Sequence, residues 1–101
     1  MEKLFVYGTL KEPEIQKEAV GRVMGGVPDS LKGWRKTEIF IEGEDYPVIV
    51  PDEKGIVDGL LLEVSPEELK TLDDYETEYK RMGVVLESGN KAWVYVVLKL
   101  L

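Results

Sequence analysis

The chain has 101 residues, enough for one hydrophobic core and too few for two, so the sequence predicts a single domain over residues 1–101. It contains no cysteine and no histidine, which excludes disulfides, thiolate nucleophiles, histidine-based triads and the usual zinc sites. The formal net charge is -7 with no basic cluster, so nucleic acid is not an expected partner. Any chemistry must therefore depend on carboxylates, hydroxyls, lysine, arginine or the backbone.

No apolar run approaches the roughly 18 residues of a membrane span, and Met1–Phe5 leads into a predicted strand rather than a signal peptide. We therefore expect a cytoplasmic protein with no membrane partner. Charged residues make up 33% of the chain, while asparagine and glutamine occur once each, as Asn90 and Gln16. This bias favours a thermophilic source, although an acidic soluble surface can produce the same composition.

The first elements expected along the chain are a strand, a short helix and a loop. Lys3–Tyr7 is apolar on both faces, which predicts a central strand. A helix of about two turns is predicted over Glu14–Val20, because Pro13 stands where a proline at the first helical position is tolerated and Gly21 follows as a stop. Gly25–Ser30 is expected to form a loop.

The middle of the chain reads as extended segments separated by breaks. Leu31–Phe40 has an extended pattern that Gly33 interrupts. Glu42–Pro47 is expected to be a second loop, followed by a short strand over Val48–Val50. Ile56–Val64 is the longest strand candidate.

The best-defined element is a helix that begins after Ser65. A hydroxyl at the N-cap, Pro66 at the first helical position and Glu68 at the third form the pattern of a capping box. This helix is predicted to run to about Tyr75, with its leucines facing inward.

The last part of the chain predicts a hairpin. Two apolar strands, Met82–Glu87 and Ala92–Leu100, flank a turn over Ser88–Lys91. Many strands with only two short helices indicate an α+β domain with a mixed or antiparallel sheet. A sheet of this size can close into a barrel, because closure removes exposed edges.

Glu76 is the first candidate functional residue. Leu69, Leu72 and Glu76 are spaced i, i+3, i+7, so all three lie on the buried face if the helix persists that far. A carboxylate moved toward an apolar environment has a raised proton affinity, which prepares a general acid or base. The alternative is that the helix ends near Tyr75 and leaves Glu76 as a solvated loop acid.

The second candidate is Tyr7-Gly8-Thr9-Leu10, directly after the first predicted strand. A glycine at a strand end allows unusual backbone conformations, and consecutive amides there can form a small anion-binding concavity. The alternative is that Gly8 and Thr9 only turn the chain.

The remaining polar and aromatic side chains have simpler interpretations. Arg81 is expected to pair with one of the many acids, and Asp73 and Asp74 to face solvent or cap the helix end. Aromatic side chains bury large apolar areas, so packing is the role expected from the residues alone for five of them: Trp34, Tyr46, Tyr79, Trp93 and Tyr95.

Six segments in order, between residues 4 and 98, carry a resemblance to a known family: Val6–Leu10, Leu31–Trp34, Gly43–Ile49, Val57–Val64, Leu72–Glu76 with Tyr79 and Arg81, and Ala92–Val96. Together they resemble the gamma-glutamylcyclotransferase-like family, in particular its small AIG2-like branch that includes gamma-glutamylamine cyclotransferases. No single segment is specific, but the ordered set is.

The resemblance implies a small barrel-like α+β fold with a site at the mouth of the barrel. It implies that the backbone of Tyr7, Gly8, Thr9 and Leu10 binds the glutamyl end of a small-molecule γ-glutamyl substrate and that Glu76 is the acid/base residue. It also places three tyrosines in the substrate site: Tyr46, Tyr79 and Tyr95. The implied reaction forms 5-oxoproline and releases an amine or amino acid, with no metal or organic cofactor.

Two departures from the family pattern bear on the substrate. Lys11–Glu14 is charged and contains a proline, where many members have a segment with glycine and asparagine. Only Thr77 and Glu78 separate Glu76 from Tyr79, where several relatives known for amine substrates have a longer insertion. The resemblance therefore supports the fold and the site more strongly than it supports the identity of the leaving group.

Two other classes of function remain open at this point. One is a non-catalytic small-molecule binding protein on the same fold, and the other is a protein-interaction domain that uses only the barrel surface. Glu76 favours catalysis, because a binding pocket for an anionic substrate gains nothing from an additional buried acid. The sequence does not give the oligomeric state.

Overall fold

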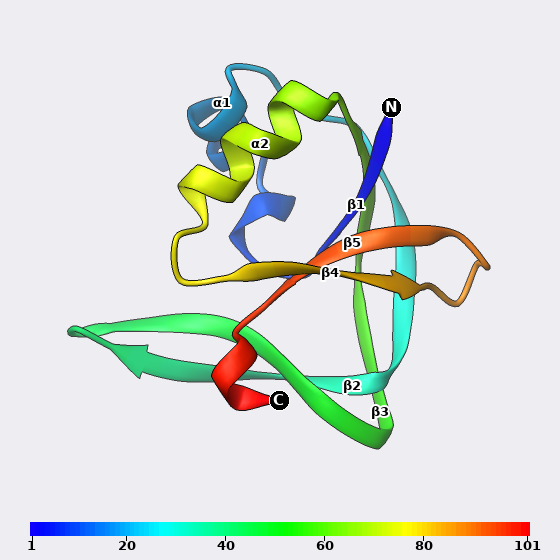
Figure 1. Ribbon diagram of the computed structural model, residues 1–101. Helices are drawn as coiled ribbons and strands as arrows, with labels where there is room; N and C mark the ends of the chain where they lie inside the picture. The colour runs from blue at the N-terminus through cyan, green and yellow to red at the C-terminus, as the bar shows by residue number, and fades with distance from the viewer.

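The computed structural model describes residues 1–101 as one five-stranded sheet with two α-helices packed together at one end (Figure 1). The elements are β1 (Glu2–Val6), η1 (Thr9–Lys11), α1 (Pro13–Val20), β2 (Gly26–Ile41), β3 (Glu44–Val64), α2 (Pro66–Tyr75), β4 (Lys80–Val85), β5 (Lys91–Val96) and η2 (Leu98–Leu100).

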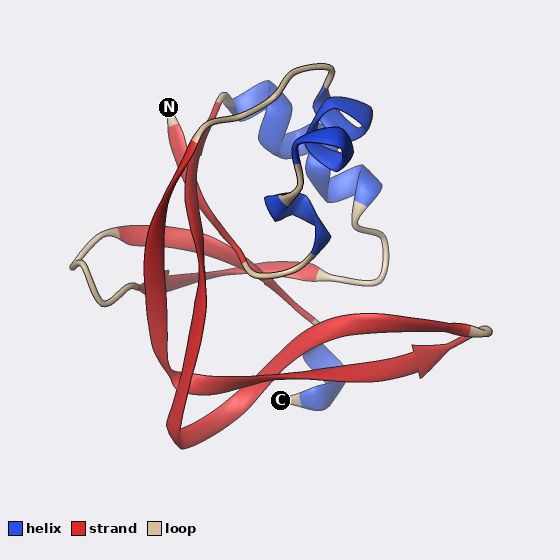
Figure 2. Ribbon diagram, turned by 180° about the vertical axis from the view of Figure 1, so that it is seen from behind, coloured by secondary structure: helices blue, strands red, loops and turns tan.

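The strand order is β2-β3-β1-β5-β4. β1 pairs in parallel with β5, and every other neighbouring pair is antiparallel. The sheet curls into a half-barrel with the helices outside one end of it (Figure 2). The predicted α+β class, mixed sheet and barrel-like shape are confirmed.

β1 is central, as predicted, and it is buried on both faces. Leu4 and Val6 point into an apolar cluster that includes Leu69 and Leu72 of α2. Phe5 and the adjacent Tyr7 point the other way, into a cluster inside the curl of the sheet. This two-sided burial fixes the end of β1, from which the Tyr7–Leu10 segment leaves.

β2 and β3 form a long hairpin that bends sharply part-way along its length. Lys32 pairs with Ile56 and Trp34 pairs with Pro51, so residues 52–55 bulge out opposite Gly33, whose φ is 88°. Beyond the bend, residues 34–41 and 44–51 form a two-stranded ribbon that projects from the half-barrel (Figure 1). This ribbon is called the β2–β3 arm below.

The predicted loop Gly25–Ser30 is wrong, because Gly26–Ser30 lies in β2, and the predicted loop Glu42–Pro47 is right only at its first two residues, because Glu44–Pro47 lies in β3. Pro28 is tolerated because β2 is an edge strand. Pro47 is tolerated because its part of β3 has only β2 as a neighbour. The turn is Glu42-Gly43, where φ is positive at both residues (49° and 86°), as a type I′ hairpin turn requires.

The capping box that begins α2 is confirmed. The Ser65 hydroxyl accepts a hydrogen bond from the Glu68 N–H at 3.0 Å, and the Glu68 carboxylate accepts one from the Ser65 N–H at 2.9 Å. The same carboxylate binds the Arg22 guanidinium, which with the Ser65 bonds lowers the pKa of Glu68 to about 2.

The last strands begin earlier than predicted, and Leu98–Leu100 is a 3₁₀ turn instead of the end of a strand.

Gly59→Ala is expected to lower the free energy of unfolding by about 3 kcal/mol, at the upper end of overpacking costs. A Cβ on Gly59 of β3 would overlap the Val6 carbonyl oxygen and lie 2.8 Å from Cζ of Phe5. The matched control is Gly83→Ala in β4, where a Cβ meets nothing within 4 Å. Denaturant unfolding of both variants checks this, and equal stabilities would contradict it.

Candidate active site

A cavity of ≈ 330 Å³ lies where the end of β1, the β2–β3 arm, the end of α2 and β5 come together. All eight residues that the sequence places in the site line it: Tyr7, Gly8, Thr9, Leu10, Tyr46, Glu76, Tyr79 and Tyr95. The lining also contains five residues that the sequence did not single out: Phe5, Val6, Asp45, Pro47 and Tyr75. The structure therefore brings together segments that are up to 90 positions apart in the chain.

Glu76 occupies the C-cap of α2, one position past the end of the helix. The helix ends at Tyr75, but the Glu76 N–H still donates to the Leu72 carbonyl at 2.8 Å. Glu76 therefore continues the inward-facing stripe of Leu69 and Leu72. Its side chain is half-buried and lines the cavity, so the alternative of a solvated loop acid is wrong.

The carboxylate of Glu76 has no partner within the protein. It takes part in none of the side-chain hydrogen bonds and none of the ion pairs. Burial raises its pKa above the ordinary glutamate value. An unpaired carboxylate with a raised pKa, facing a cavity, can accept and return a proton.

Asp73, one turn earlier on α2, has the opposite environment. Burial disfavours its charged form, but hydrogen bonds from Arg81 and Tyr95 outweigh this and hold the pKa of Asp73 below its ordinary value. Asp73 therefore stays ionised and committed to its partners. Two nearby carboxylates whose environments move their pKa values apart are suited to different roles, and only Glu76 is free to exchange a proton.

The expectation that Asp73 faces solvent or caps the helix is wrong, whereas the expected ion pair of Arg81 is present. Arg81 binds Asp73 with two hydrogen bonds, at 2.7 and 2.9 Å, and its guanidinium lies 4.6 Å from the centre of the Trp93 ring. The bidentate contact joins the end of α2 to β4, and the Trp93 contact extends the link to β5. It thereby fixes the segment that carries Glu76.

Five tyrosines line the cavity. Three of them, Tyr7, Tyr79 and Tyr95, are called the tyrosine wall below, and each of their hydroxyls donates to an oxygen from a distant part of the chain. Tyr7 donates to the carbonyl of Tyr95 at 2.6 Å, and Tyr95 donates to Asp73 at 2.9 Å. Tyr79 donates to the carbonyl of Pro47 at 2.6 Å, and its ring meets that of Tyr95 edge to face at 6.5 Å. These bonds lock the rings in place.

Burial is the main reason why the pKa values of all three tyrosines are raised, and the charge of Glu76 adds to the effect. All three are therefore neutral at physiological pH. Their hydroxyl protons are already donated to fixed acceptors, so these side chains shape the cavity instead of moving protons.

The segment after β1 presents unpaired backbone donors at the edge of the cavity. η1 begins at Thr9, and the N–H groups of Gly8, Thr9 and Leu10 donate no hydrogen bond within the chain. The carbonyls of Gly8 and Thr9 accept from Lys11 and Glu12, at 3.1 and 2.9 Å, which holds the turn in shape. Three free N–H groups in one turn can bind a carboxylate or a developing oxyanion.

Gln16 supports this turn from behind, and sequence reasoning did not identify it. It is the only buried polar side chain of the chain. Its amide nitrogen donates to the Leu10 carbonyl at 2.8 Å, and its amide oxygen accepts from the Met24 N–H at 2.7 Å. The sequence feature that could have identified Gln16 is its position three residues before Ala19, which places it on the inner face of α1.

Gln16→Leu is expected to lower the free energy of unfolding by about 2 kcal/mol, because the change leaves the Leu10 carbonyl and the Met24 N–H without partners. The control is Lys17→Ala, which removes an exposed side chain of the same helix. Denaturant unfolding of both variants provides the measurement. A Gln16 variant as stable as the parent would show that the two bonds contribute nothing.

The sequence family described as "Gamma-glutamyl cyclotransferase, AIG2-like" matches residues 4–100. The chain belongs to this family. AIG2-like protein C of Arabidopsis thaliana is 41% identical over 83 residues, which cover 80% of this chain and 47% of that protein. AIG2-like protein A of the same plant is 35% identical over 95 residues, which cover 90% of this chain and 56% of that protein. The chain thus spans about half the length of these curated family relatives.

Solved structures of similar proteins have the same fold. A solution structure of an Arabidopsis thaliana protein superposes with a TM-score of 0.81 and 30% identity, covering 97% of this chain and 62% of that one. A structure named gamma-glutamyl cyclotransferase gives a TM-score of 0.79 at 13% identity, covering 95% of this chain and 66% of that one. The second likeness concerns the fold alone.

Two further findings concern the molecule as a whole. The structure contains no cluster of three or more acidic side chains placed to hold a metal ion. None of its helices has the length and apolar character needed to cross a bilayer.

Proposed function

We propose that the chain catalyses a gamma-glutamylcyclotransferase-type reaction. The α-amine of a γ-glutamyl group attacks its own γ-carbonyl carbon, and the bond from that carbon to the γ-amide nitrogen breaks. The products are 5-oxoproline and a free amine or amino acid. The observation that carries the proposal is the unpaired carboxylate of Glu76, with its raised pKa, in the same cavity as the free N–H groups of the Tyr7–Leu10 segment.

Glu76 supplies the proton transfers of this reaction. The α-amine attacks only as the neutral amine, so its ammonium form must first give up a proton to the Glu76 carboxylate. The departing nitrogen must then gain a proton, which the protonated Glu76 returns. One side chain therefore both accepts the proton and returns it, and the nucleophile belongs to the substrate.

The Tyr7–Leu10 segment binds the glutamyl end through its backbone. Its free N–H groups are donors that a carboxylate or a developing oxyanion accepts without reorganisation of the protein. The neutral tyrosine wall places aromatic ring surface beside the reacting atoms. Family membership and a fold shared with a structure named gamma-glutamyl cyclotransferase support this assignment.

The second candidate function is non-catalytic binding of a small molecule in the same cavity. The three free N–H groups and the aromatic wall suit binding as well as catalysis. Glu76 separates the two functions, because an unpaired, partly buried carboxylate costs stability and weakens the binding of an anion. The presence of this group favours turnover over binding alone.

A panel of γ-glutamyl dipeptides and γ-glutamyl amines tests the proposal. The expected result is release of 5-oxoproline, measured by chromatography, from at least one compound. Saturable binding of panel compounds without release would support the binding protein instead. If no compound of the panel binds and none releases 5-oxoproline, both functions are contradicted.

Treatment with a chelator is expected to leave turnover of an accepted γ-glutamyl substrate unchanged. The nucleophile and the leaving group both belong to the substrate, and Glu76 and backbone amides supply the remaining groups, so no step needs a Lewis acid. The measurement compares 5-oxoproline release before and after dialysis against EDTA. Loss of turnover that returns on adding a divalent metal would contradict this mechanism.

A further inference from the structure

The β2–β3 arm is a two-stranded ribbon, so both of its long edges lack a neighbouring strand within the chain. The β3 edge of the arm is unsuited to a further strand. Pro47 and Pro51 lie in it and have no N–H to donate, and the Pro47 carbonyl already accepts from Tyr79. The open edge of the arm is therefore that of β2, over residues 34–41.

The earlier part of β2 is covered by the turn between β4 and β5. The Glu87 N–H donates to the Ser30 carbonyl at 2.8 Å, and the Ser88 hydroxyl donates to the Asp29 carboxylate. The arm is the longest open stretch of this edge, and it projects away from the half-barrel (Figure 1). An exposed edge strand presents unpaired N–H and C=O groups that can pair with a strand of another chain.

The β2–β3 ladder fixes which backbone groups of this edge point outward. Glu38 pairs with Pro47, which has no N–H and whose carbonyl is bonded elsewhere, so this pair exchanges no ladder hydrogen bonds. In an antiparallel ladder such pairs alternate with hydrogen-bonded ones, and their N–H and C=O groups point away from the partner strand. Every second residue from Trp34 to Phe40 therefore points these groups outward, and none of the groups has a partner outside the ladder.

Two copies of this edge are complementary to each other in one antiparallel register. Outward-pointing residues must meet outward-pointing residues, so the two-fold axis of a symmetric pairing passes through a residue of the strand. With the axis at Thr37, Lys36 of each copy lies opposite Glu38 of the other. Trp34 of each copy likewise lies opposite Phe40 of the other. Opposite-charge pairs and aromatic pairs across two strands both stabilise a sheet.

The registers one residue away lack this match, and so does the other edge of the sheet. An axis at Lys36 or at Glu38 places two like charges directly opposite each other, which destabilises a sheet. The other edge strand, β4, begins with Lys80 and Arg81 and contains no acid, so pairing it with itself gives no ion pair. The charge pattern therefore favours the arm and this one register.

The exposure of Phe40 and the local charge of the edge support the same arrangement. The Phe40 side chain is 71% exposed and lies on the arm face that also carries Trp34, so the pairing covers an apolar ring that the single chain leaves in water. Residues 34–41 hold two basic side chains and one acidic side chain, in a chain of net charge -7. Two copies therefore meet at this edge without the repulsion expected over the rest of the surface.

We propose that the chain forms a symmetric dimer through the β2 edge of the β2–β3 arm, with the two-fold axis at Thr37. The occupant of the open edge is a second copy of this chain. Every second residue from Trp34 to Phe40 exchanges two backbone hydrogen bonds with the opposite strand. The sheet then runs through both copies. The inference goes beyond the reaction assigned to Glu76 and does not depend on it.

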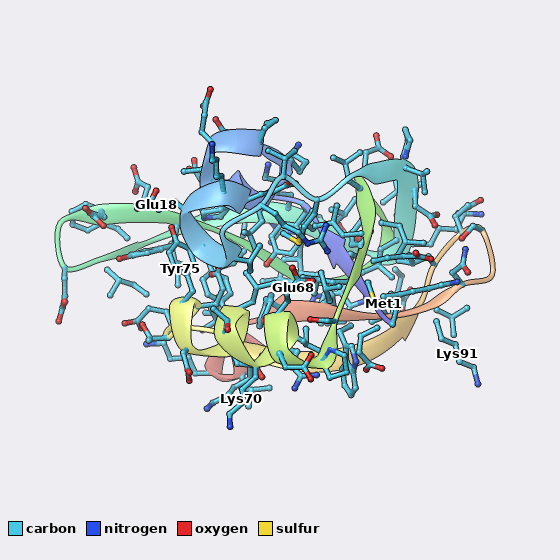
Figure 3. All side chains as sticks on the ribbon, turned by 90° about the horizontal axis from the view of Figure 1, so that it is seen from above. Met1, Glu18, Glu68, Lys70, Tyr75 and Lys91 are labelled. Carbon is cyan, nitrogen blue, oxygen red and sulfur yellow. The ribbon has the colours of Figure 1, made fainter.

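Sedimentation velocity over a dilution series tests the dimer. The parent protein is expected to show a concentration-dependent equilibrium between monomer and dimer, as interfaces of small area give. Lys36→Glu and Glu38→Lys each turn two opposite-charge pairs into like-charge pairs, and each is expected to raise the Kd of the dimer roughly tenfold or more. The control is Lys70→Glu, because Lys70 is an exposed lysine on α2 that points away from the molecule (Figure 3), and this variant should dimerise as the parent does.

Mixing the two single variants tests the register. Each variant alone carries like charges at positions 36 and 38, but the charges of one variant are opposite to those of the other. The mixture is therefore expected to form a heterodimer with a Kd close to that of the parent dimer. The double variant Lys36→Glu/Glu38→Lys restores the opposite-charge pairs within one chain and should dimerise again. Circular dichroism of every variant checks that the fold is retained.

Three results would overturn the inference. The parent could remain monomeric up to about 1 mM, a concentration at which even weak interfaces associate. Dimers could form that neither single variant weakens, which would place the interface elsewhere on the surface. The mixture and the double variant could stay monomeric like the single variants, which would exclude the register with its axis at Thr37.

Discussion

Glu76→Gln is expected to lower turnover of an accepted γ-glutamyl substrate by roughly a hundredfold or more, the usual scale for losing a general acid/base. Glutamine keeps the size and approximate shape of the side chain but cannot accept and return a proton at neutral pH. Because no protein group pairs with the carboxylate of Glu76, the change breaks no hydrogen bond or ion pair. The loss should therefore appear in kcat with little change in the folded structure.

Glu78→Gln is the matched control, since it makes the same chemical change two positions away. Glu78 is exposed and does not line the cavity. Its variant should keep nearly all of the parent activity. Equal activities of the two variants, or a larger loss at Glu78, would falsify the assignment of the proton transfer to Glu76.

The pH dependence of activity gives an independent check. Burial raises the pKa of Glu76, so kcat/KM should fall as the pH is lowered through this raised value, where the carboxylate becomes protonated and can no longer accept a proton. The midpoint of this acid limb is expected above the ordinary glutamate pKa of about 4.3. A limb at or below that value would contradict a buried base.

The same pKa shift predicts an effect on stability with a definite sign. A carboxyl group whose pKa is raised in the folded state contributes stability below its unfolded-state pKa and loses that contribution as the pH rises through the folded-state value. At neutral pH the charged Glu76 therefore destabilises the fold. Glu76→Gln should unfold at a higher denaturant concentration than the parent at pH 7, and the difference should disappear at acid pH.

Strong local signals made much of the fold predictable from the sequence. The two-sided apolar pattern of Lys3–Tyr7 identified the central strand, and the capping box at Ser65 fixed the start of α2. The β2–β3 hairpin was misread because its prolines and glycines normally mark loops. Their tolerance depends on which strands lie next to them, and that is a property of the assembled sheet.

The candidate site was predictable for a different reason. The spacing of Leu69, Leu72 and Glu76 pointed the carboxylate inward although the helix ends at Tyr75, because the C-cap residue keeps the last helical hydrogen bond. Tyr46, Tyr79 and Tyr95 entered only through the family resemblance. Asp45, Pro47 and the supporting Gln16 had no comparable signal, since their roles depend on contacts between segments far apart in the chain.

Gly8→Val is expected to lower kcat/KM by about a hundredfold, because small misplacements of a binding group carry losses of this size. A Cβ on Gly8 would lie 2.9 Å from Cγ of Pro47, so a β-branched side chain must push the Tyr7–Leu10 segment and the β2–β3 arm apart. The Pro47 carbonyl accepts a hydrogen bond from the Tyr79 hydroxyl, so the same displacement disturbs the tyrosine wall. Both the free N–H groups and the wall would then lose their positions.

Thr9→Ser is the matched control, because it keeps the hydroxyl and the backbone of an exposed residue in the same turn. It should be nearly neutral if recognition depends on the N–H groups and not on the side chain. Ligand titrations and circular dichroism of both variants separate lost binding from lost folding. A valine variant that folds normally and binds ligand as tightly as the parent would show that the glutamyl group is held elsewhere, since a Cβ at 2.9 Å from Cγ of Pro47 forces a shift at this contact.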